Sequence, residues 1–167
     1  RRGWRVTVTL TPTAGVWLAD SGEWGRLEEL TGFVVRDRSR LPTQPKPHPP
    51  ADCVVVAPAS ANTVVKLAVG IADNQALTKA VEAIGDPAVA VVVFPRVNAR
   101  HARHPAWPGH LATLRAGGVH LVEGPDVWPL EEPGEAGPRA LPWSHILDRV
   151  EAVAPVKGSW RTPGHAG

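Results

Sequence analysis

The chain has 167 residues, of which 43% are hydrophobic and 20% are charged, and its formal net charge at pH 7 is +2. This length suits one domain with one hydrophobic core, so we expect residues 1–167 to form a single domain. No apolar run approaches the roughly 20 residues that cross a bilayer, and acidic residues balance the basic ones, which argues against membrane-spanning and nucleic-acid-binding proteins.

The first third of the chain predicts short elements joined by loops. Residues 6–10 alternate β-branched and apolar side chains and predict a strand. Irregularly spaced apolar residues over 17–30, with glycines between them, predict one or two short helices. Residues 33–35 predict a brief strand. Five prolines within 41–50 predict an extended loop that cannot be helical.

The centre of the chain predicts an alternation of strands and helices. Continuous apolar runs at 53–57 and 89–94 are typical of parallel strands buried on both faces, and a third strand is expected at 119–122. The helices are expected at 61–68, ending at Gly70, at 74–84, capped by Asp73, and at 104–116. This order predicts an α/β fold with a parallel sheet between two layers of helices.

Residues 124–142 are rich in Gly, Pro and Glu and are expected to form a mobile flap, followed by a closing helix over 143–153. In such folds the site lies at the carboxyl ends of the strands. The candidate segments are therefore 11–14, 58–63, 95–101 and the proline-rich loop around His48.

The segment Pro-Ala-Ser-Ala-Asn-Thr at 58–63 is the most informative of these. It places small side chains and free backbone N–H groups at the start of a helix, where a phosphate or carboxylate is favoured. Ordinary capping of that helix by Ser60 or Asn62 is the alternative interpretation.

The same segment, with its continuation over 66–74, resembles the PASANT motif of the homo-oligomeric flavin-containing cysteine decarboxylases. Residues 95–101 are similar to the second signature of that family, P-x-M-N-x-x-M. The resemblance spans residues 6–122. It implies a Rossmann-like, flavodoxin-like fold and a trimer, sometimes assembled into a dodecamer, with FMN bound at a subunit interface.

The resemblance also implies roles for particular residues. Asn98 would lie near the substrate carboxylate, and a histidine near the flavin would handle protons. In the family, the flavin oxidises the carbon that bears the thiol, the carboxylate leaves as CO2, and an enethiol is formed. The residues implied around FMN are Thr11, Thr13, Ala59, Ser60, Asn62 and Thr63.

Three departures from the family pattern affect the expected site. Val97 and His101 replace the two methionines of the second signature, although Asn98 is kept. His48 stands closer to the central strand than the family histidine does. The strand, phosphate loop and helix with which the family begins are missing before residue 6, so we expect an N-terminal extension ahead of Arg1 and an exposed strand edge.

The histidines supply the candidate proton-handling groups, because imidazole titrates near neutral pH. We expect His48, Asn98 and His101 to be the catalytic residues, with an exposed loop position as the alternative for His48. A metal site built from His101, His104 and His110 is not expected, since no acidic or thiol ligand accompanies them.

Cys53, the single cysteine, favours a reducing compartment, the cytoplasm, and lies in an apolar run that predicts a core position. Phosphopantothenoylcysteine decarboxylases, one branch of the family, use a later cysteine on the flap. Its absence favours the branch that decarboxylates the C-terminal cysteine of a peptide. The alternatives are a flavin prenyltransferase, whose phosphate substrate Arg96, Arg100 and Arg103 would hold, and a non-catalytic flavin-binding protein.

Overall fold

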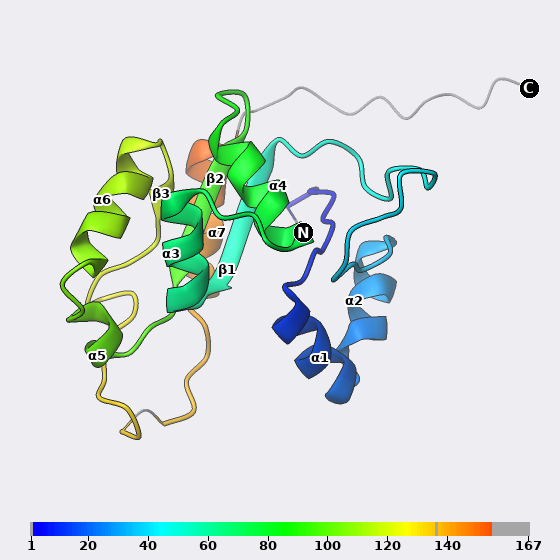
Figure 1. Ribbon diagram of the computed structural model, residues 1–167. Helices are drawn as coiled ribbons and strands as arrows, with labels where there is room; N and C mark the ends of the chain where they lie inside the picture. The colour runs from blue at the N-terminus through cyan, green and yellow to red at the C-terminus, as the bar shows by residue number, and fades with distance from the viewer. Residues whose placement is uncertain (1, 136, 155–167) are drawn as a thin grey trace, which may run out of the picture.

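A three-stranded parallel sheet forms the centre of the computed structural model, which describes residues 2–135 and 137–154 (Figure 1). The strands lie in the order β1 (Cys53–Ala59), β2 (Ala90–Pro95) and β3 (His120–Leu121). All neighbouring strands are parallel. The carboxyl ends of β1 and β2 therefore meet at one edge of the sheet.

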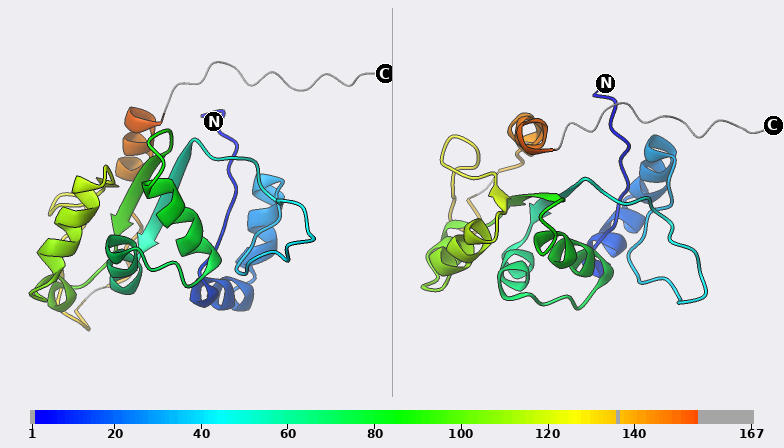
Figure 2. Two further views of the ribbon diagram at one scale, coloured as in Figure 1. Left: turned by 45° about the horizontal axis from the view of Figure 1, so that its top comes forward. Right: turned by 90° about the horizontal axis from the view of Figure 1, so that it is seen from above.

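Helices cover both faces of this sheet (Figure 2). The helices α3 (Ala61–Val69), α4 (Gln75–Ile84) and α6 (Trp107–Ala116) lie on one face, and α7 (Trp143–Val153) lies on the other. Each face has its own hydrophobic core, one between the sheet and α3, α4 and α6, the other between the sheet and α7. The predicted three-layer α/β architecture is confirmed.

The central strand β2 connects the two cores. Val91 and Val93 belong to the first core, whereas Val92 and Phe94 belong to the second. By contrast, Val55 is 41% exposed on β1, which is an edge strand with no outer partner in residues 2–135 and 137–154. The predicted burial on both faces is thus right for β2 and wrong for β1.

The N-terminal part lies beyond β1 and contains α1 (Pro12–Asp20) and α2 (Glu23–Thr31), which confirms two short helices (Figure 1). The predicted strands at 6–10 and 33–35 are wrong, since a single parallel bridge joins Thr9 and Arg36. Two strand segments alone bury too little apolar surface to form a stable ladder. The loop over 41–50 has no helix, as predicted.

Several element ends differ from the predictions. Asn74, and not Asp73, caps α4, because its Oδ1 accepts a hydrogen bond from Leu77 N at 3.1 Å. Asp73 instead forms an ion pair with Lys66, Oδ2 to Nζ 2.5 Å, and this contact lowers the pKa of Asp73. Strand β1 continues through Pro58 to Ala59.

The segment after β2 is divided more finely than predicted. A short helix, α5 (Ala99–Ala102), precedes α6, which begins at Trp107 and not at His104. The described residues of 124–142 contain no helix or strand, whereas α7 matches the predicted closing helix. None of the helices in the described part of the chain is long and apolar enough to cross a membrane.

Candidate cofactor and substrate site

The start of α3 provides a polar end of a helix beside small side chains. Ser60 caps this helix, its Oγ accepting from Thr63 N at 3.3 Å and lying 3.2 Å from Thr63 Oγ1. Ala59 is fully buried and Thr63 is nearly so, whereas Ser60 and Asn62 are exposed. The backbone N–H groups of Ala61 and Asn62 lie in the first turn and have no acceptor within the helix. The capping interpretation of Ser60 therefore holds, and two backbone donors remain for an anion.

The two signature segments meet at the carboxyl edge of the sheet. Ala59 is in register with Pro95, and Arg96 N donates to Ala59 O at 2.8 Å. The last residue of β1 and the residue that follows β2 are therefore direct neighbours. Parallel pairing, rather than sequence proximity, brings segments 58–63 and 95–101 together.

Asn98 caps the short helix α5, its Oδ1 accepting from His101 N at 3.0 Å. His101 is exposed on that helix. Ala99 N donates to Glu131 O at 2.9 Å, which ties α5 to the segment predicted as a flap. Asn98, His101 and this segment are thus brought together.

The helix α1 also begins at this end of the sheet (Figures 1 and 2). Thr11 caps it, accepting from Ala14 N at 3.3 Å, while Thr13 is exposed within it. Thr11 and Thr13 therefore lie at the same end of the sheet as the start of α3.

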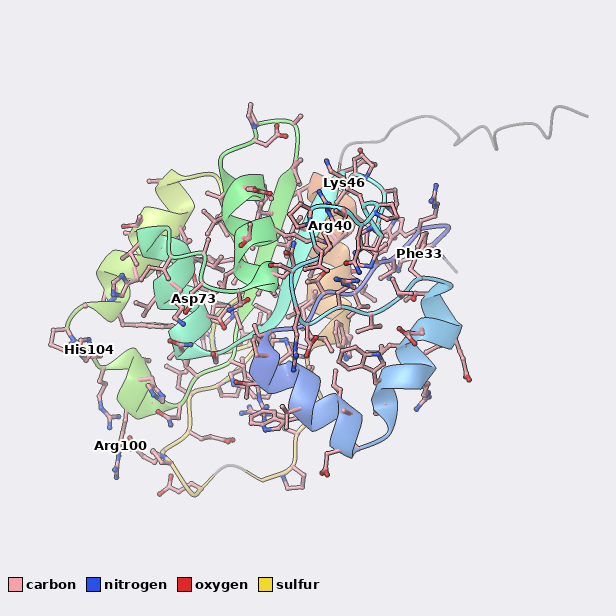
Figure 3. All side chains as sticks on the ribbon, turned by 45° about the vertical axis from the view of Figure 1, so that its right-hand side comes forward. Phe33, Arg40, Lys46, Asp73, Arg100 and His104 are labelled. Carbon is pink, nitrogen blue, oxygen red and sulfur yellow. The ribbon has the colours of Figure 1, made fainter. Side chains whose placement is uncertain are left out.

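Arginines gather around α5 and the segment after β3. Arg100 Nε lies 3.3 Å from Glu132 Oε2, and Arg103 Nη1 lies 2.5 Å from Glu132 Oε1. The Arg103 guanidinium lowers the pKa of the Glu132 carboxyl, and Arg100 adds to this effect. Arg100 and His104 project from the outer side of this region (Figure 3). Sequence reasoning missed Glu132, because no local pattern marks a pairing across about thirty residues.

Trp128 contacts one aromatic ring and two arginines, and the sequence did not mark it as part of the site. Its ring meets the ring of buried Phe94 edge to face, with centroids 5.5 Å apart. The Arg139 guanidinium carbon lies 3.9 Å from the Trp128 centroid, and that of Arg96 lies 5.7 Å away. Arg139 Nη2 is also 3.3 Å from Glu131 Oε2. Among residues 2–135 and 137–154, however, this oxygen and Arg139 Nε are buried without a hydrogen-bond partner.

His48 lies away from these residues, on the proline-rich loop, where it contacts α4. It is only 9% exposed, so the exposed-loop alternative is wrong. Its Nε2 donates to Val34 O at 2.7 Å, and its Nδ1 accepts from Lys79 Nζ at 2.8 Å. Lys79 Nζ also donates to Thr9 Oγ1 at 2.9 Å, which links α4 to the N-terminal segment.

The surroundings of His48 favour its neutral form. Burial lowers the pKa of His48, the Val34 carbonyl opposes this, and the positive charges of Lys79 and Arg36 lower it further. Burial, followed by the charge of Arg36, lowers the pKa of Lys79. With both ring nitrogens engaged, His48 has no free atom for a substrate in this arrangement.

Cys53 is half-buried against the core under α7, close to the predicted core position, and burial raises the pKa of its thiol. Among the described residues, no group of three or more His, Cys, Asp or Glu side chains is placed to hold a metal ion. A hollow of about 610 Å³ lies at the opposite end of the sheet, around Gly85 and Gly117. It adjoins none of the signature residues, so we place the candidate site at the carboxyl edge.

Known proteins resemble this chain in fold and in sequence. A cysteine decarboxylase from thioviridamide biosynthesis, described as FMN-dependent, superposes with a TM-score of 0.55 at 30% identity, over 72% of each chain. The cypemycin decarboxylase superposes with a TM-score of 0.57 at 23% identity, over 73% of this chain and 67% of that one. The second similarity shows the fold alone.

Curated proteins match over parts of their length. A cysteine/cysteine sulfinic acid decarboxylase from an unknown prokaryotic organism is 37% identical over 73 residues, 44% of this chain and 19% of the relative. A phosphopantothenoylcysteine decarboxylase from Oryza sativa subsp. japonica is 29% identical over 146 residues, 87% of this chain and 61% of the relative. The chain thus spans less than two thirds of either relative. The family model for flavoproteins matches residues 4–154, and the chain therefore belongs to the flavoprotein family.

Proposed function

We propose that the protein is an FMN-dependent oxidative decarboxylase that acts on the C-terminal cysteine of a peptide. The observation that carries the proposal is the meeting of both signature segments at one edge of the sheet, through the bond from Arg96 N to Ala59 O. The 30% identity to an FMN-dependent cysteine decarboxylase from thioviridamide biosynthesis supports the same activity.

The residues at the start of α3 fit a flavin mononucleotide. Ala59 and Ala61 are small side chains on either side of Ser60, and the N–H groups of Ala61 and Asn62 suit an anionic or carbonyl acceptor. The exposed Asn62 side chain adds a donor and an acceptor. We propose Ala59, Ser60, Asn62 and Thr63 as the residues that hold FMN, with Thr11 and Thr13 on the α1 side. FMN, when bound, supplies the acceptor for the two electrons that the substrate loses.

Asn98 is proposed to bind the substrate carboxylate. Its Oδ1 is occupied by the α5 cap, so its Nδ2 is the atom left to donate to a ligand. The amide N–H can orient the carboxylate that departs as CO2 through a single hydrogen bond.

His101 is the better placed of the two proposed proton-handling histidines. It is exposed on the helix that Asn98 caps, so its ring can accept the thiol proton of a bound cysteine. His48 remains a second proposal, but it must first release Val34 O or Lys79 Nζ. The net reaction removes one CO2 and two hydrogens from the peptide and leaves an enethiol.

Mass spectrometry of a reconstituted reaction tests the function. Protein supplied with FMN and a peptide ending in cysteine is expected to yield a product lacking CO2 and two hydrogens, whereas the serine-ended peptide stays unchanged. Asn98→Ala and His101→Gln are expected to retain FMN absorbance and lose most of the turnover. FMN binding with unchanged cysteine peptides would refute the decarboxylase proposal.

The alternative functions gain less support from the geometry. A prenyltransferase would need Arg96, Arg100 and Arg103 for a phosphate, but Glu132 already pairs with two of them. A non-catalytic flavin-binding role would give no function to half-buried Asn98 or to the exposed His101 on the helix that Asn98 caps. Turnover that persists in the His48→Ala, His101→Ala double variant would show that neither histidine is catalytic.

We further propose that the protein is a homo-oligomer, a trimer or a dodecamer, in the cytoplasm. Val16 and Trp17 of α1 and Leu30 of α2 are 67%, 70% and 73% exposed, which gives the N-terminal helices an apolar surface suited to a second copy. Light scattering coupled to size exclusion measures the mass directly, and a monomeric mass at micromolar concentration would contradict this part of the proposal.

A further inference from the structure

The arginines at the carboxyl edge of the sheet fall into two groups. Arg100 and Arg103 pair with Glu132, and Arg139 pairs with Glu131. Arg96 is exposed and has no carboxylate partner among residues 2–135 and 137–154. Its guanidinium is therefore the one of these four whose charge no acidic side chain balances in the described structure.

The position of Arg96 connects it to the proposed flavin site. Its backbone N–H bonds to Ala59 O, one residue before the Ser60 cap of α3. Two residues further along the chain, Asn98 caps α5. The Arg96 side chain thus starts between the residues proposed to hold FMN and the residue proposed to hold the substrate.

The Arg96 side chain is also oriented by a fixed surface. Its guanidinium carbon lies 5.7 Å from the Trp128 ring centroid, within the range of a cation–π contact. Phe94, which is fully buried, and Arg139 hold that ring in place. Such orientation lowers the entropy that Arg96 loses when it binds a ligand, and leaves its N–H donors available.

We propose that Arg96 is a specificity residue that binds a carboxylate of the peptide substrate. A guanidinium donates two parallel N–H bonds to a carboxylate, a geometry that neither an amide nor an ammonium reproduces. The carboxylate is either the C-terminal one or an acidic side chain close to it. This inference rests on the proposed function in one respect, namely that the ligand is a peptide.

Binding of unreactive peptides tests the role of Arg96 without turnover. The probes are four fluorescein-labelled hexapeptides ending in Glu-Ser or Gln-Ser, each as the free acid and as the C-terminal amide. Serine replaces cysteine so that no reaction consumes the probe. Fluorescence anisotropy is measured with FMN present for the wild type, Arg96→Gln and Arg96→Lys, with Arg100→Gln as a matched control of the same charge change.

For a peptide that carries the recognised carboxylate, Arg96→Gln is expected to weaken binding about tenfold, Arg96→Lys less, and Arg100→Gln hardly at all. Loss on C-terminal amidation identifies the terminal carboxylate, and loss from Glu to Gln identifies the side chain. Equal affinity of wild type and Arg96→Gln for all four probes, or no binding by the wild type, would overturn the inference.

The two proposals fail separately. Decarboxylation of cysteine peptides with an unchanged KM in Arg96→Gln would refute only the role of Arg96. Arg96-dependent binding of the serine peptides without any decarboxylation of the cysteine peptide would refute only the enzymatic function. Circular dichroism of each variant checks that the exposed substitutions leave the fold intact.

Discussion

Acidification is expected to destabilise the fold through His48, and the structure sets the sign and the limit of the effect. His48 is 9% exposed and faces the cations Lys79 and Arg36, so the pKa of His48 is lower in the folded chain than in the unfolded one. Below the unfolded pKa of about 6.5, the unfolded chain binds a proton that the folded chain does not. The contribution of neutral His48 to the free energy of unfolding is therefore complete above that pH and decreases as the pH falls below it.

If His48 stays neutral in the fold, this difference removes at most about 2 kcal/mol between pH 7 and pH 5. His48→Gln keeps a donor for Val34 O but cannot titrate, so its unfolding free energy should depend less on pH over this interval. Chemical denaturation followed by tryptophan fluorescence at pH 7, 6 and 5 measures both proteins. His101→Gln, a matched change at an exposed histidine, should keep the dependence of the wild type. Equal slopes for wild type and His48→Gln would refute the reasoning.

Three further substitutions test the packing of the fold by thermal or chemical unfolding. Gly15→Ala should destabilise α1, because a Cβ there would lie 2.9 Å from Asp37 Cβ, and normal stability would show that the 36–37 loop yields freely. Ile146→Ala should cost about 2–5 kcal/mol, since this side chain is fully buried between α7 and the sheet, and a cost below about 1 kcal/mol would contradict that packing. Asn74→Ala should cost about 1 kcal/mol of unfolding free energy through loss of the α4 cap, whereas Asp73→Ala should leave the cap intact. A larger loss of stability in Asp73→Ala than in Asn74→Ala would identify Asp73 as the capping residue.

The sequence predicted the layered core well because β2 and its flanking helices have strong local patterns. Continuous apolar residues mark a strand that contributes to two cores, and Gly70 ends α3 in the left-handed conformation, with φ 74°. The N-terminal strands were predicted wrongly because alternation indicates a tendency, whereas a ladder requires a neighbouring strand. Only Thr9 and Arg36 pair there.

The sequence predicted the parts of the site that are encoded in local motifs. It did not predict the parts that depend on contacts between distant segments of the chain. The motifs around Ser60 and Asn98 were identified from their residues. The hydrogen bond of His48 Nδ1 depends on Lys79, which is 31 positions away, and the Arg96–Trp128 contact depends on how the segment after β3 returns to the sheet. A tryptophan within a Gly- and Pro-rich segment was the available signal, since conspicuous aromatic residues on loops often have a binding role.

The bond between Arg96 N and Ala59 O fixes the register between the two motifs. One residue inserted into either strand would reverse which side chains face which helices and would shift Ser60 past Arg96. Gains and losses of length should therefore be tolerated within 41–50 and 124–140, which contain no helix or strand among the described residues, and be rejected within 53–59 and 90–95. A library of single-residue insertions, sorted by soluble expression, would map this division along the chain.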